Sequence, residues 1–94
     1  MSQATMSPPA RQLRLLAVFD GRQWASICRD LDIASAGRTA DEALDTLEAA
    51  VRDALAYERE SGVSAGAPVS DEDIAGFLDT AHAQQPPAAR LIFV

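Results

Sequence analysis

A long run of helix-spaced apolar residues begins after Thr39 and fixes the largest element of this chain. Side chains three and four positions apart share one face of an α-helix, and the apolar ones here are Ala40, Ala43, Leu44, Leu47, Val51, Ala54 and Leu55. Gly62 marks the expected end, because glycine readily takes the left-handed conformation that closes helices. A helix of up to about 22 residues is about 33 Å long, enough to cross a small sheet.

The start of this helix has the pattern of a capping box. Thr39 can accept a hydrogen bond from the backbone N–H of Glu42, and Glu42 can reach back to the backbone N–H of Thr39. Just before it, Gly37 is expected to supply a positive φ to a tight turn. The segment therefore predicts a junction between a short strand and the long helix.

Three β-compatible runs precede the junction, at 13–19, 24–29 and 33–36. Asp20-Gly21 is a strong hairpin signal between the first two. After the long helix, Ser70 opens a shorter helix with acidic residues in its first turn, and 91–94 is an apolar run that fits a terminal strand. We predict an α+β fold: a three-stranded antiparallel meander plus a long helix (β-β-β-α), with an extra short helix and a C-terminal strand. Residues 1–10 are expected to form a flexible leader and 11–94 a single domain.

The first strand is apolar on both faces, which is typical of strands that are central or covered on two sides. One face can pack on the long helix, but the second helix is short. We therefore expect the chain to form a homo-oligomer, a dimer or a small multiple of one.

Charge is unevenly distributed along a chain whose net charge is −6. The part before Thr39 has five arginines and three aspartates, whereas the part from Thr39 onward has three arginines and eleven acids. Nucleic-acid backbones are bound by clustered cations, so we expect no strong direct nucleic-acid binding. An acidic surface favours a basic protein partner, and it also serves simply to keep a small protein in solution.

Candidate catalytic groups are few. Cys28 and His82 are one conceivable nucleophile pair, and Asp30 with Asp32 is a conceivable metal or acid–base pair. A buried inert thiol, a solvated histidine and a solvated turn explain the same residues better, since nothing supplies an orienting third group. We expect no catalytic site, cofactor or metal, and hence no enzyme.

No apolar run approaches the roughly 18 residues of a membrane span, and the N-terminus lacks a secretory pattern. We expect no membrane partner and a cytoplasmic location.

Between about Leu13 and Leu55 the chain resembles the HicB-like antitoxin family. The matching segments are 15–19, the turn Asp20-Gly21, 24–27, 33–35, Gly37-Arg38-Thr39 and Glu42-Ala43-Leu44. Many members have Pro-x-Leu-Pro-Gly-Cys before the third strand, where this chain has the shorter segment 29–33. We find no candidate here for the DNA-binding segment that some relatives add.

The resemblance implies a bacterial antitoxin that binds and neutralises a small basic RNase toxin of the HicA type. Its motif residues Gly37, Thr39 and Glu42 are structural. Acids on the long helix, for instance Asp45, Glu48 and Asp53, are the candidates for facing the toxin. The alternative is a stand-alone, self-associating small domain with a structural or ligand-sensing role and no toxin.

Overall fold

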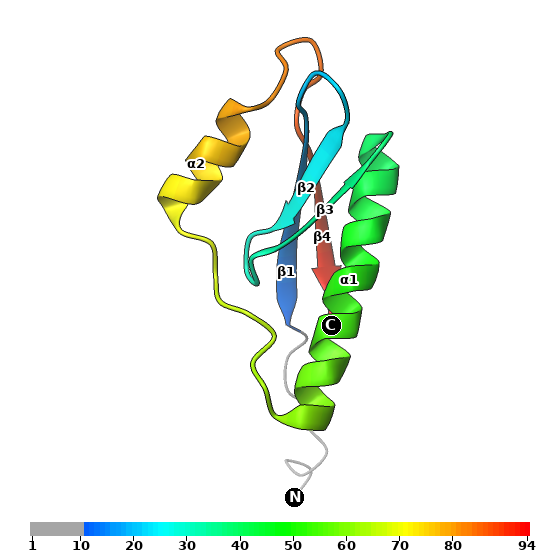
Figure 1. Ribbon diagram of the computed structural model, residues 1–94, viewed down its shortest axis with the longest axis vertical. Helices are drawn as coiled ribbons and strands as arrows, with labels where there is room; N and C mark the ends of the chain where they lie inside the picture. The colour runs from blue at the N-terminus through cyan, green and yellow to red at the C-terminus, as the bar shows by residue number, and fades with distance from the viewer. Residues whose placement is uncertain (1–10) are drawn as a thin grey trace, which may run out of the picture.

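The computed structural model describes residues 11–94 and has the predicted α+β fold (Figure 1). The predicted leader, 1–10, lies outside the described residues. The elements in chain order are β1 (Gln12–Phe19), β2 (Trp24–Cys28), β3 (Ile33–Gly37), α1 (Ala40–Ser61), α2 (Asp71–Asp79) and β4 (Ala88–Phe93).

The strands form one antiparallel sheet in the order β3-β2-β1-β4. At the β1–β2 hairpin, the Asp20 carboxylate accepts from the backbone N–H groups of Arg22 and Gln23, at 2.9 and 3.0 Å. Gly21 has φ +99°, so a glycine suits the turn as predicted. The last strand is longer than predicted because residues from Ala88 onward pair with β1.

The sheet has an inner face, packed on α1, and an outer face on the opposite side. Alternate residues of β1, among them Leu13 and Leu15, meet the apolar stripe of α1 to form the buried core. The buried residues of that stripe are Ala43, Leu44, Leu47, Val51 and Leu55. Each large aliphatic side chain buried in this way contributes about 1.5–3 kcal/mol. This packing makes α1 the main support of the sheet.

Gly37 is required for a reason other than the predicted one. Its φ is not positive, so the expectation of a left-handed turn residue is wrong. Instead, a Cβ atom on Gly37 would lie 2.6 Å from the backbone nitrogen of Ala43. The glycine lets β3 approach the first turn of α1, and a hydrogen bond from the Ser26 hydroxyl to the Ala43 carbonyl (2.9 Å) ties β2 to the same turn.

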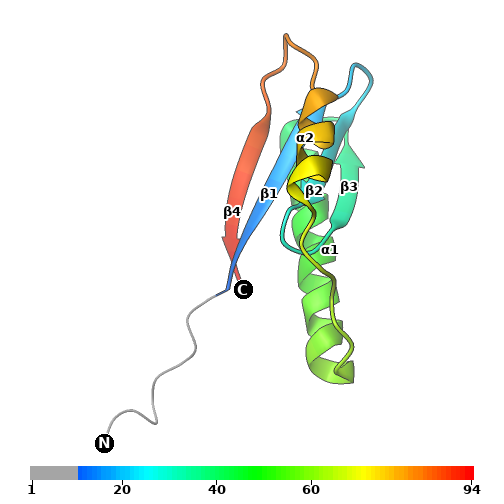
Figure 2. The same ribbon diagram turned by 90° about the vertical axis from the view of Figure 1, so that its left-hand side faces the viewer.

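The outer face is covered only in part, by α2 (Figure 2). Two hydrogen bonds flank α2: the Val69 N–H donates to the Arg29 carbonyl (2.8 Å) and the His82 N–H to the Phe19 carbonyl (2.6 Å). Ile74 is the one residue of α2 that is buried. The part of the outer face formed by β1 and β4 lies beside α2 and stays open, with Leu91 half exposed.

We predict that Gly37→Ala destabilises the fold while Gly76→Ala, in α2, does not. Overpacking against backbone costs about 1–3 kcal/mol, whereas a Cβ on Gly76 meets nothing within 4 Å and gains helix propensity. Urea denaturation monitored by circular dichroism measures both. Equal stability of the two variants would contradict the close approach of β3 and α1.

Candidate functional site

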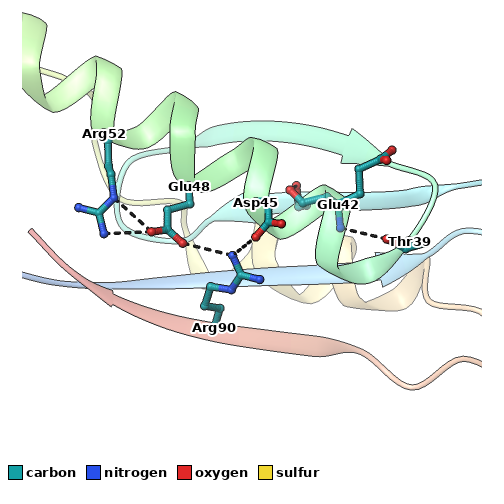
Figure 3. A network of polar contacts seen from close by, with 8 residues as sticks. Thr39, Glu42, Asp45, Glu48, Arg52 and Arg90 are labelled. Carbon is teal, nitrogen blue, oxygen red and sulfur yellow. Dashed lines mark hydrogen bonds and ion pairs between the residues drawn. The ribbon is translucent and has the colours of Figure 1, made fainter.

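The side chain of Arg90, on β4, reaches α1 and pairs with Asp45 and Glu48, two of the acids predicted to face a partner (Figure 3). Its Nη1 lies 2.7 Å from Asp45 Oδ1 and 3.2 Å from Glu48 Oε1. Arg52 holds the second oxygen of Glu48 with two bonds, from Nε at 3.1 Å and Nη2 at 3.0 Å. The hydrogen bond from Arg90 to Asp45 is the main cause that raises the pKa of the guanidinium. Asp45 and Glu48 are therefore partly neutralised within the chain.

Asp53 lies apart from these two acids. It is five positions after Glu48, about 140° further around the helix axis. It is eight positions after Asp45, about 80° around the axis, so it lies nearer to the face of Asp45 than to that of Glu48. Asp53 is exposed and forms no ion pair within residues 11–94. Of the three predicted partner-facing acids, it is the one whose charge is fully available.

Only one of the two hydrogen bonds predicted for the capping box forms at the start of α1. The Thr39 hydroxyl accepts from the Glu42 N–H at 3.0 Å. The carboxylate of Glu42 accepts from the N–H of Arg38 at 2.9 Å, rather than from Thr39, so that part of the capping box is wrong by one residue. The three motif residues thus act together, and their role is structural: Gly37 provides room, and Thr39 and Glu42 bind donors before and within the first turn.

A surplus of exposed carboxylates remains on the two helices. Those that are exposed and have no ion pair in the described part of the chain are Asp41, Asp53, Glu60, Glu72, Asp73 and Asp79. Five of the eight arginines, by contrast, are already paired with acids of the same chain: Arg14, Arg29, Arg38, Arg52 and Arg90. The helices therefore present a negative surface.

The two candidate catalytic residues, Cys28 and His82, do not lie close together. Cys28 is buried opposite Leu15, and burial is the main cause that raises the pKa of its thiol. His82 is exposed and packs edge-on against Phe19, with ring centroids 5.9 Å apart. Because Leu15 and Phe19 are four residues apart on β1, Cys28 and His82 lie at about 13 Å spacing along the sheet.

The two aspartates of the β2–β3 turn are also separated in role. Asp30 accepts from the backbone N–H and the guanidinium of Arg14, at 2.8 and 2.9 Å. Asp32 is exposed, with φ +55°. No group of three or more candidate metal ligands occurs within 11–94. Asp30 is thus committed to an ion pair that joins the turn to β1.

A hollow of about 440 Å³ opens on the outer face, and no sequence pattern indicates it directly. Its apolar lining includes Leu16, Ala89 and Leu91, and Arg14 and Arg29 line it as well. Both arginines are paired, with Asp30 and Asp71 respectively, at 2.9 Å. Alternation in β1 predicted an uncovered apolar face, but not which strands would form it.

Comparison of the chain with protein-family models, curated proteins and solved structures finds no match. Within the described residues, no helix is both long and apolar enough to cross a membrane. The candidate site is accordingly defined by geometry alone: the negative helices and the open outer face.

We predict that acid unfolding depends on Asp30. Partial desolvation raises the pKa of its carboxyl, but the hydrogen bonds from Arg14 outweigh this and hold the pKa below its ordinary value. A lowered folded-state pKa gives stability that is present above the unfolded value of about 3.9 and is lost as the pH falls.

Asp30→Asn should therefore lower the free energy of unfolding at pH 7, by about 1 kcal/mol or less, and flatten its fall below pH 4. Urea melts over a pH series measure this. Parallel pH curves for Asp30→Asn and the unaltered chain would show that the pair with Arg14 is not formed in solution.

Proposed function

We propose that this protein is an antitoxin that binds and neutralises a small basic RNase, as its resemblance to the HicB-like family implies. The observation that carries the proposal is the surplus of exposed carboxylates on α1 and α2. An RNase must attract the RNA backbone with cations. A protein surface rich in free carboxylates is complementary to such a partner and repels RNA itself.

Neutralisation follows from occupancy of the toxin's RNA site. The net charge of −6 speeds the encounter with a cationic protein. Once bound, the folded antitoxin excludes RNA from the cationic surface that it covers. Because Asp45 and Glu48 are already paired with Arg90, the exposed acids of α1 left without an ion pair in the described residues, and so free to meet the partner, are Asp41, Asp53 and Glu60.

The proposal includes a cytoplasmic location, since that is where a toxin of this type cleaves RNA. It includes no catalytic role, cofactor or membrane partner for this chain.

One observation favours the alternative, a self-associating domain without a toxin. Leu91 and Phe93 of β4 expose 50% and 57% of their surface, side by side on the outer face. An apolar pair of this size beside an open hollow indicates an interface, and self-association is compatible with either function.

Co-expression with a basic RNase encoded beside this gene tests the antitoxin proposal. Growth arrested by the RNase should be rescued by the unaltered chain. Failure to rescue, together with no binding of the purified pair, would contradict the proposal and leave the self-associating domain as the better account.

We predict that the acids of α1 set the association rate with that RNase. The double variant Asp53→Arg/Glu60→Arg should slow association severalfold and change dissociation less, because exposed charges act mainly through steering. It leaves the Arg90 ion pairs intact. Surface plasmon resonance over a salt series measures both rates.

The matched control is Glu72→Arg/Asp79→Arg, which makes the same change of charge on α2, across the sheet. If the toxin meets α1, this control slows association less. An association rate indifferent to salt and to both variants would exclude electrostatic steering.

We also predict that the purified chain binds nucleic acid weakly. Its net charge is negative and most of its arginines are paired internally, so little counterion release is available. A gel-shift assay at about 150 mM salt measures this. Submicromolar, sequence-selective retention of a DNA duplex would overturn the prediction.

A further inference from the structure

The free edge of β4 carries unpaired backbone groups beside exposed apolar side chains. Arg11 and Val94 exchange both backbone hydrogen bonds, at 3.0 and 2.9 Å. In an antiparallel ladder, residues alternate between those that bond to the neighbouring strand and those that point away from it. Counting back from Val94, the residues of β4 that point away from β1 are Ala89, Leu91 and Phe93.

These residues also present their side chains on the outer face. They lie opposite Leu16, Arg14 and Gln12 of β1, in that order. The exposed row therefore combines main-chain donors and acceptors with Leu91 and Phe93, the most exposed large apolar residues of the sheet. Such an edge is a template for another strand.

β4 has few of the usual features that protect an edge strand: its inward-pointing charge is one, and that charge is neutralised within the chain. Between Ala88 and Phe93 there is no proline, lysine or carboxylate. Its one charge, Arg90, is turned to the inner face and held by Asp45 and Glu48 of the same chain. The opposite edge, β3, packs closely under α1 (Figure 1).

We propose that the partner of this edge is β4 of a second copy, paired antiparallel about a two-fold axis at Leu91. In this register Leu91 meets Leu91 of the other copy and Phe93 meets its Ala89, a large side chain against a small one. All three outward residues then exchange both of their hydrogen bonds. The pairing joins the two sheets into one continuous sheet.

Pairing registers with the axis shifted by one residue are less favourable. An axis at Arg90 sets two like charges directly opposite each other, which destabilises a ladder. An axis at Ile92 sets the large side chains of Leu91 and Phe93 against each other, without a small residue opposite either. At Leu91, Arg90 lies opposite Ile92 of the other copy instead.

Charge opposes a second copy less at this edge than on the helices. Two chains of net charge −6 repel each other, and the free carboxylates lie on α1 and α2. No carboxylate lies on β4, and the two acids of α1 that reach it, Asp45 and Glu48, are paired with Arg90. The inference rests on the self-association suggested above, and it does not need a toxin.

Single cysteines test the register. Leu91→Cys should give a covalent dimer on mild oxidation at micromolar concentration, because residues paired across the axis have Cα atoms about 5.5 Å apart, within disulfide reach. Ala89→Cys is the matched control: the two copies of residue 89 would be about 13 Å apart and should not cross-link. The native Cys28 is buried in both variants. Non-reducing gels give the result.

Light scattering of the unaltered chain and of Leu91→Lys completes the test. We expect a dimer for the first, a monomer for the second, and a dimer for the control Ala34→Lys on β3. A monomeric unaltered chain would refute self-association as a whole. A dimer in which Ala89→Cys cross-links as well as Leu91→Cys, or one that survives Leu91→Lys, would refute only the β4 interface, because the chain would then associate elsewhere.

Discussion

The structure depends on β1, a central strand with apolar residues on both faces. Its two sets of alternate side chains each need a cover, since both would otherwise lie in water. The inner set is buried by α1, whose five buried residues fill one side of the sheet. Within residues 11–94 the outer set has α2, a helix of nine residues with one buried side chain, and Val69 just before it. The unequal cover of the two faces accounts for the stable inner core and for the open β1–β4 surface.

The same asymmetry separates two kinds of surface. Most acids sit on the helices, where an exposed face costs no apolar burial, and the exposed large apolar residues of the sheet, Leu91 and Phe93, sit on β4. Arg90 connects the two: its backbone belongs to the edge strand and its guanidinium neutralises Asp45 and Glu48 on α1. A partner drawn by charge would meet the helices, and a second copy would meet the edge. The two proposals therefore use different parts of the molecule and need not compete.

The fold was largely predictable because its signals are local. The helical spacing after Thr39, the Gly62 stop and the Asp20-Gly21 turn depend on residues near one another in sequence. The reason for Gly37 was not predictable in this way, because the clash that excludes a Cβ is with Ala43 across the junction. A glycine required for a positive φ and a glycine required for a close approach look the same in the sequence.

The candidate site was less predictable, for the same reason. Asp45, Glu48 and Asp53 are similar in sequence, and only the fold shows that Arg90, far along the chain, reaches the first two. The length of β4 and the open hollow depend equally on long-range pairing with β1. The register of the sheet also places Cys28 and His82 apart, so the nucleophile pair that the sequence left open does not form.

Hydrogen exchange of the backbone amides, followed by NMR, tests the unequal cover of the two sheet faces most directly. The account predicts the slowest exchange in β1, β2 and the core-facing turns of α1, with α2 exchanging orders of magnitude faster through local opening. If the amides of α2 were as strongly protected as those of α1, the outer face would be firmly covered, and the open β1–β4 surface would not exist in solution.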